Sequence, residues 1–94
     1  MALGSGWALD ETEDYGARYD ELVRGDSWLE DQIEILYIGL LRGPTGPAFA
    51  SKILGEYWYA ILPGPPQLVV FYSVDEEAQI IMLETLRVSQ PDDY

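Results

Sequence analysis

Two stretches in the first half of the chain have the hydrophobic spacing of amphipathic helices. In segment 10–25 the apolar residues recur three or four positions apart, on one helical face: Tyr15, Tyr19, Leu22 and Val23. Asp10 and Glu13 have the spacing of a capping box, and Gly25 suits the left-handed residue that follows a helix. We therefore expect a first helix that begins near Asp10 and ends at Arg24-Gly25.

The second stretch begins with another capping box, from Ser27 to Glu30. The helical spacing then continues through Leu29, Ile33, Leu36, Tyr37 and Leu40. Arg42-Gly43-Pro44 ends this helix, because proline has no N–H to continue the hydrogen-bond ladder. The connection between the two helices is short, which predicts an antiparallel helical hairpin with one shared apolar seam.

After Gly55 the sequence changes to the character of β-strands. Segment 56–62 is aromatic and apolar, and segment 67–73 is β-branched and aromatic, which is typical of a strand covered on both faces. Segment 79–88 is the last long strand, and the proline-rich residues 63–66 and the acidic residues Asp75-Glu76-Glu77 provide the turns. Three consecutive strands with short links predict an antiparallel meander.

Two shorter elements complete the prediction. Trp7-Ala8-Leu9 has the composition of a short first strand, and Ala48 to Ile53 is interpreted as one helical turn. The element order is (β)ααβββ, an α+β domain with the helical hairpin on one face of a three- or four-stranded, mainly antiparallel sheet. All 94 residues are expected to form one domain, with residues 1–6 flexible.

The composition removes several kinds of chemistry. The chain has no cysteine and no histidine, so a disulfide framework, a thiolate metal site, a cysteine nucleophile and an imidazole-based centre are all excluded. Only an all-carboxylate site for a hard cation would remain, and no loop has the spacing for one. We expect neither a cofactor nor a metal.

The charge balance indicates which partners the chain favours. With 5 basic and 17 acidic residues, the formal net charge is −12. Such a field repels phosphate backbones and anionic membrane surfaces, so nucleic acid is disfavoured and a basic protein segment is favoured. No apolar run approaches the length of about 20 residues that spans a bilayer, and residues 1–6 do not resemble a signal peptide. We therefore expect a cytoplasmic protein without a membrane contact.

Three segments carry a resemblance to a known family. Leu54-Gly55-Glu56-Tyr57-Trp58-Tyr59, the run from Val69 to Glu77, and Leu86-Arg87-Val88 resemble the RelE/ParE toxin superfamily in sequence and in order. The resemblance implies a toxin of a bacterial toxin–antitoxin module. RelE-like members cut mRNA in the ribosome and ParE-like members inhibit DNA gyrase, and an antitoxin segment that wraps the toxin neutralises both.

The resemblance also implies where a catalytic apparatus would lie. The family's strand arginine would fall on Val69, and the histidine and arginine of its tail would fall on Ser89 and Gln90. These side chains cannot neutralise the charge that gathers on a phosphate, and loss of such electrostatic groups costs orders of magnitude in rate. Most of the ribonuclease apparatus is therefore missing.

Three residues remain as candidate catalytic groups. Tyr94 stands where the family often has a C-terminal tyrosine, and Glu56 and Lys52 lie near positions that hold a carboxylate or lysine in some members. A terminal tyrosine is more often frayed or packed on the surface. Lys52, Arg42 and Arg87 could converge on a phosphate, although an arginine in a strand more often pairs with a carboxylate such as Glu84.

The aromatic residues of the first two long strands are the candidate partner-binding residues. In an acidic domain they favour a protein groove over stacking on nucleic acid bases, because aromatic side chains anchor protein interfaces. Alternation places one set in the core and one set outward, and the sequence does not decide which set is which. The candidates are Tyr57, Trp58, Tyr59, Phe71 and Tyr72.

The sequence therefore predicts a RelE/ParE-like protein that acts mainly by binding protein. The partner could be a basic antitoxin segment, attracted by the acidic run from Asp10 to Glu34, although the default interpretation of that run is a solvated outer face of the helical hairpin. Exposed sheet edges also make a homodimer plausible. The alternatives are a metal-independent endoribonuclease, a DNA gyrase inhibitor and an interaction domain without toxicity.

Overall fold

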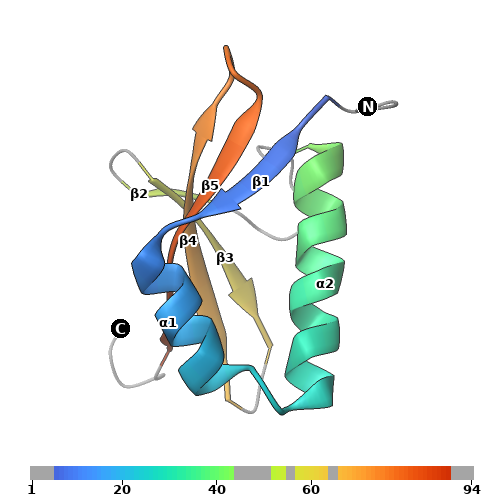
Figure 1. The fold of residues 1–94 in the computed structure, drawn as a ribbon, viewed down its shortest axis with the longest axis vertical. Coiled ribbons are helices and arrows are strands. Elements are labelled where there is room, and N and C mark those ends of the chain that lie inside the picture. Colours follow the sequence, from blue (N-terminus) through green and yellow to red (C-terminus); the bar gives the residue numbers. More distant parts are fainter. Residues whose placement is uncertain (1–5, 44–51, 55–56, 64–65, 90–94) are drawn as a thin grey trace.

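The computed structural model describes residues 6–43, 52–54, 57–63 and 66–89 (Figure 1). They form an α+β domain of two layers, which confirms the predicted fold class. The elements are β1 (Ala8–Glu11), α1 (Glu13–Leu22), α2 (Ser27–Arg42), β2 (Lys52–Leu54), β3 (Tyr57–Leu62), β4 (Leu68–Asp75) and β5 (Ile80–Val88).

The described strands form one five-stranded sheet in the order β1-β5-β4-β3-β2. β3, β4 and β5 make the predicted antiparallel meander. The predicted N-terminal strand is present as β1, which pairs in parallel with the first half of β5, so that Ala8 lies opposite Ile80 and Glu11 opposite Leu83. The sheet has one strand more than the sequence predicted, and this strand is β2.

The segment that contains β2 was interpreted as a helical turn, and for its last two residues that prediction is wrong. Lys52 and Ile53 pair in antiparallel fashion with Tyr59 and Trp58 of β3. Local propensity favours a helix here only weakly, whereas an adjacent strand edge offers hydrogen-bond partners for an extended backbone. Residues 48–51 lie outside the described part of the chain.

α1 begins two residues later than its capping pattern indicated. Thr12 is the N-cap, and its hydroxyl accepts a hydrogen bond of 3.1 Å from the backbone N–H of Tyr15. Asp10, the expected cap, lies in β1 opposite Met82. Because Asp10 is needed in the parallel pairing of β1 with β5, the helix can begin only after that strand has ended.

α2 begins one residue earlier than expected. Its N-cap is Asp26, whose carboxylate accepts from the N–H of Leu29 at 3.2 Å. Glu30 reaches back and accepts from the N–H of Gly25 at 3.2 Å, which resembles the reciprocal bond of a capping box. Gly25 has a φ of +94°, so it supplies the left-handed turn predicted between the helices.

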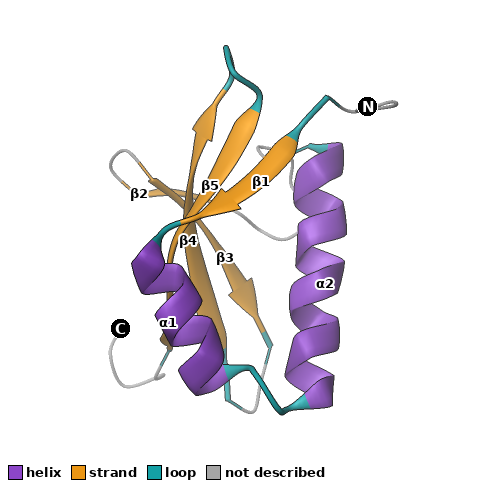
Figure 2. Cartoon of the chain, in the orientation of Figure 1, coloured by secondary structure: helices purple, strands orange, loops and turns teal. Residues whose placement is uncertain are grey.

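Both helices lie on the same side of the sheet, but they diverge from their short connection (Figure 2). A cleft of about 540 Å³ opens between them, so they do not share an apolar seam along their length as the sequence suggested. Each helix packs on the sheet instead. The buried residues of α2 are Leu29, Ile33, Leu36 and Leu40, and those of the sheet include Ala60, Leu62, Leu68, Val70, Tyr72, Ile81, Leu83 and Leu86.

Candidate partner-binding face

Alternation along the strands gives the sheet two different faces. In β3, Ala60 and Leu62 are buried beneath the helix layer, whereas Tyr57 and Ile61 are exposed. Side chains of successive strand residues point to opposite faces, so Tyr57, Tyr59 and Ile61 share the face that no described helix covers. We call this surface the open face. It comprises Tyr57, Tyr59 and Ile61 of β3, Val69 and Phe71 of β4, and Thr85 and Arg87 of β5, and Val69 at its centre is only 5% exposed.

An aromatic pair lies at the centre of the open face. Tyr59 and Phe71 are directly opposite in the antiparallel register, and their ring centroids are 6.0 Å apart with an interplanar angle of 42°. This tilted arrangement is a favourable one for cross-strand aromatic rings. Tyr57 is 43% exposed and lines, together with Phe71, a hollow of about 350 Å³.

The structure divides the five aromatic candidates between the two faces. Tyr57, Tyr59 and Phe71 lie on the open face, where a partner could reach them. Tyr72 is fully buried, and Trp58, opposite Tyr72 in the register, packs against the core. Tyr72 thus belongs to the core rather than to a contact surface. Whether the three residues of the open face bind a partner stays a prediction.

Arg87 contributes a positive charge to this face. It is exposed and lies on the hollow with Tyr57, Phe71, Glu84 and Thr85. The sequence favoured an ion pair between Arg87 and Glu84, yet among the described residues Arg87 has no carboxylate within 4.0 Å. Glu84 instead accepts a hydrogen bond of 2.8 Å from the hydroxyl of Ser73.

A register shift between β4 and β5 explains where Glu84 points. Phe71 lies opposite Thr85 while Tyr72 lies opposite Leu83, so Glu84 is an extra residue on β5. Such a bulge re-aims the side chain that it contains. Ile61 and Thr85 also belong to this region and were not among the residues predicted from the sequence, although counting every second position back from Arg87 places Thr85 beside it.

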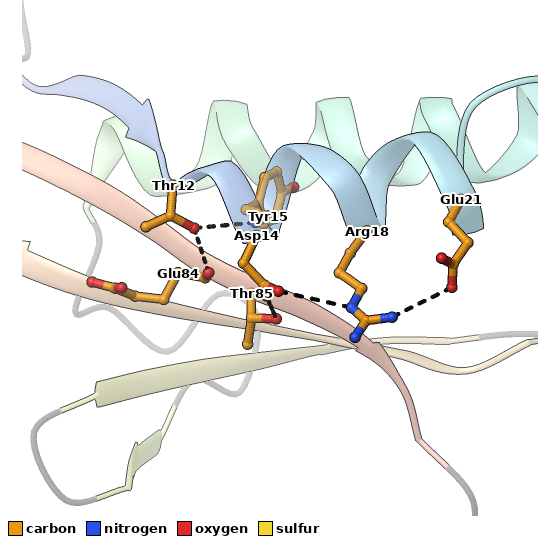
Figure 3. Close-up of polar contacts among 7 residues, drawn as sticks. All are labelled: Thr12, Asp14, Tyr15, Arg18, Glu21, Glu84 and Thr85. Carbon is orange, nitrogen blue, oxygen red and sulfur yellow. Dashed lines mark hydrogen bonds and ion pairs between the residues drawn. The ribbon is translucent and has the colours of Figure 1, made fainter.

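Side-chain hydrogen bonds hold α1 against the second half of β5 (Figure 3). The Thr12 hydroxyl donates to the carbonyl of Glu84 at 2.6 Å, and the Thr85 hydroxyl donates to the carboxylate of Asp14. β1 pairs with β5 only as far as Leu83. Beyond that residue α1 contacts β5 in place of β1. This edge is therefore covered and does not offer its backbone to a partner.

The cleft between the helices is the second concave surface. Glu11, Glu13 and Asp20 contribute acidic side chains to its lining. Tyr37 also lines the cleft, and its hydroxyl is 2.6 Å from that of the buried Tyr15. Burial raises the pKa of Tyr37 to about 12 and, together with the hydrogen bond that the Tyr15 hydroxyl makes to Tyr37, raises the pKa of Tyr15 above its usual value of 10. Both phenols are therefore protonated at neutral pH.

The positive charges do not gather around one cavity in the described part of the chain. Arg24 donates to Asp20 at 2.6 Å, and Arg42 lies at the end of α2. Arg18 and Arg87 border a groove of about 270 Å³ between α1 and β5, but Arg18 lies within 4.0 Å of both Asp14 and Glu21. A polyanion would meet one unpaired guanidinium there, and more than one is usually needed to hold a phosphate in its transition state.

The three candidate catalytic residues are not brought together by anything that the structure describes. Tyr94 and Glu56 lie outside the described residues. Lys52 is placed only by its backbone, opposite Tyr59 in the sheet. Within the described ranges no three acidic residues are grouped to hold a metal ion. None of the helices in those ranges is long and apolar enough to cross a membrane.

Comparison with solved structures identifies the fold. A YoeB/ParE toxin from Agrobacterium tumefaciens superposes with a TM-score of 0.74, covering 87% of this chain and 98% of that one. The chain has a RelE/ParE-like toxin fold. A chain of the E. coli RelBE toxin–antitoxin complex, with a TM-score of 0.71, covers 89% of this chain and is itself covered to 98%.

Sequence identity to these RelE/ParE-like structures is low. It is 19% for the Agrobacterium toxin and 17% for the RelBE chain. At this level a structural likeness shows the fold alone, because one fold supports many functions. No protein-family model and no curated protein matches the sequence.

Proposed function

We propose that this chain is a cytoplasmic, toxin-like protein of a toxin–antitoxin module, and that it acts chiefly by binding protein through the open face. The observation that carries the proposal is an aromatic surface with Tyr57 exposed, beside Arg87, which has no ion-pair partner among the described residues. Tyr57 is 43% exposed, and Arg87 shares its hollow. Tyrosine and arginine are enriched at protein interfaces, where they supply the residues that dominate the binding energy.

An antitoxin is the partner that the available observations support. The structural neighbour from E. coli is part of a toxin–antitoxin complex. The net charge of −12 on this chain attracts a basic segment, and its acids are concentrated on the helix layer. A basic antitoxin would thus be steered electrostatically to the helices. The hollow of the open face would take an aromatic or aliphatic side chain of a second protein, the target of the toxin.

Metal-independent RNA cleavage is the second candidate, and the hollow gives it a specific basis. A phenol, a carboxylate and a guanidinium border the same concavity, in the side chains of Tyr57, Glu84 and Arg87. Cleavage needs a base for the 2′-hydroxyl proton, an acid for the leaving oxygen and cations for the phosphate. Arg87 is the one cation among the described residues that line the hollow, and the surrounding negative charge also makes this candidate the weaker one.

Expression in bacteria separates the two candidates. The chain is induced as wild type, as Tyr57→Ala and as Arg87→Gln, with Glu77→Gln in the exposed β4–β5 turn as the matched control. Growth, mRNA integrity and plasmid supercoiling are measured together. Protein binding predicts growth arrest with intact mRNA, lost in Tyr57→Ala, retained in Glu77→Gln and relieved by co-expression of a basic partner encoded by an adjacent gene.

Each other outcome has a distinct meaning. Cut mRNA in the wild type that becomes intact in Arg87→Gln would replace the binding proposal with the ribonuclease. Arrest with intact mRNA and loss of negative supercoiling would identify DNA gyrase as the protein target. Normal growth with every variant, at equal amounts of soluble chain, would overturn a toxin-like role.

A further inference from the structure

The outward side of α2 is apolar although no described element covers it. Trp28 is 46% exposed, Ile35 is 51% exposed and Ile38 is 52% exposed. α2 stands at the side of the molecule, and no described helix or strand lies beyond it (Figure 2). A surface helix usually carries polar residues on this side, so three large apolar residues within three turns indicate a contact.

The spacing of these residues is that of a helix–helix seam. Trp28, Asp31, Ile35, Ile38 and Arg42 follow one another at intervals of three, four, three and four residues, and all five are exposed. This is the a/d pattern of a two-helix coiled coil, in which one stripe faces a partner helix. It is separate from the stripe of buried residues that packs α2 on the sheet.

The charges on the seam specify the partner and its direction. A parallel pairing of two copies would place Asp31 against the partner's Asp31 and Arg42 against the partner's Arg42. An antiparallel pairing matches a positions with d positions, which places Ile35 opposite the partner's Ile38 and Asp31 opposite the partner's Arg42. In the described part of the chain neither Asp31 nor Arg42 has an ion-pair partner of its own.

We propose that α2 binds a second copy of this chain, as an antiparallel helix pair about a two-fold axis between Ile35 and Ile38. The seam is self-complementary, which is the requirement for an isologous dimer: the same stripe serves both chains, with Ile35 and Ile38 at the two-fold axis and the opposite charges of Asp31 and Arg42 on either side of them. Glu34, the next acid on this side, falls opposite the partner's Gly39 and meets no like charge.

The dimer should be weak. One helix face buries much less than the roughly 800 Å² per partner of a standard stable interface, and two chains of net charge −12 repel each other. We therefore expect a reversible dimer with a dissociation constant in the micromolar to millimolar range. The interface uses the helix layer and leaves the open face free, so it goes beyond the proposed function and does not depend on it.

Sedimentation equilibrium of the full chain over a wide concentration range tests the dimer. The wild type should associate reversibly, and Ile35→Ser should weaken association by at least about tenfold, because it removes the central apolar contact twice. Tyr57→Ala, on the open face, should leave association unchanged. A wild-type chain that is monomeric at every concentration would overturn the proposal, as would association that Tyr57→Ala abolishes and Ile35→Ser does not.

A charge exchange tests the orientation. Asp31→Arg alone and Arg42→Asp alone should each weaken the dimer by about tenfold, because like charges then face each other at both ends of the seam. The double variant, with the two charges exchanged, should regain wild-type association. Both positions are exposed, so the thermal midpoint of each variant should stay close to that of the wild type. A double variant as weak as the singles would exclude the antiparallel pairing.

The absence of cysteine from the chain allows a direct test of register. Ile35→Cys and Ile38→Cys chains are mixed in equal amounts and oxidised mildly. The proposed register predicts that the mixed disulfide, from position 35 to the partner's position 38, forms faster than either homodisulfide, because these Cβ atoms face each other. Homodisulfides at position 35 in excess would place the two-fold axis at Ile35 and overturn the register.

Discussion

The two helices occupy one layer of the molecule but are held there by different forces. α1 buries only Tyr15 among its ten residues, and polar bonds from Thr12 and Asp14 hold it along β5. α2 buries four apolar residues and has apolar side chains on its outward side as well. Arg18 of α1 lies within 4.0 Å of Asp14 and Glu21 in the same helix, whereas neither Asp31 nor Arg42 of α2 has an ion-pair partner among the described residues.

This difference indicates what each helix contributes. α2 supplies most of the apolar surface that the helix layer buries against the sheet, so it should dominate stability. α1 covers the edge of β5 where β1 ends, so it should determine whether that edge is closed to other strands. Pairs of substitutions, one in each helix or one on each side of α2, can test this difference between the two helices.

The largest expected effect comes from the two sides of α2. Leu36 is completely buried, so Leu36→Ala should lower the free energy of unfolding by about 2–5 kcal/mol through lost burial and the cavity that remains. Ile38→Ala, two residues away and 52% exposed, should change it by less than about 0.5 kcal/mol at concentrations where the chain is monomeric. Urea unfolding measures both. Equal losses would show that the outward side of α2 is already covered in the monomer.

The N-caps provide the next comparison. Thr12→Ala removes the α1 cap and also the 2.6 Å bond to the carbonyl of Glu84, so it should cost about 2 kcal/mol. Asp26→Ala removes only the α2 cap and should cost about 1 kcal/mol. Thr12→Ser keeps both bonds and is the matched control. If Asp26→Ala were the more costly substitution, the tether of α1 to β5 would contribute little.

The alkaline pH range tests the contact between the helices. The native pKa of Tyr37 is about 12, and an unfolded tyrosine titrates near 10, so the unfolded chain loses this proton first as pH rises. The contribution of Tyr37 is complete below pH 10 and is lost as pH rises towards about 12. Tyr37→Phe should therefore show a shallower loss of stability in this window, measured by urea unfolding at each pH. An unchanged slope would contradict the burial of this phenol.

The sequence predicted the elements of this fold well where the signal was local. The helical spacing of α2, the glycine turn at Gly25 and the β3–β5 meander were all readable, because each depends on neighbouring residues. The N-cap of α1 was not, because Asp10 and Thr12 are both good caps and the choice depends on the pairing of β1 with the distant strand β5. β2 was missed for the same reason, since its partner lies in β3.

The candidate site shows the same limit. Alternation revealed that the aromatic residues of β3 and β4 divide between two faces, but only the position of the helices decides that Tyr59 and Phe71 face outward while Trp58 and Tyr72 face the core. The bulge at Glu84 has no local signal, so the expected pairing with Arg87 could not be judged from the sequence. The catalytic candidate Tyr94 stays a prediction.

The smallest effects distinguish two glycines in and after α1. Gly25 has a φ of +94°, which residues with a Cβ atom rarely adopt, so Gly25→Ala should cost about 1 kcal/mol although no atom lies within 4 Å of the added carbon. Gly16 is inside the helix, where alanine is preferred by up to about 1 kcal/mol. A Cβ at Gly16 would lie 2.8 Å from Oε2 of Glu11, the far end of an exposed and flexible side chain that can swing aside.

We therefore expect Gly16→Ala to raise the thermal midpoint slightly and Gly25→Ala to lower it, with the double variant close to the wild type because the two changes are independent. If Gly16→Ala were instead destabilising, the carboxylate of Glu11 would be fixed against the helix. The variant Gly16→Ala with Glu11→Ala decides this point, since removal of the carboxylate should then restore the gain. Such a result would mean that α1, like α2, depends on a tightly packed contact rather than on its polar bonds to β5 alone.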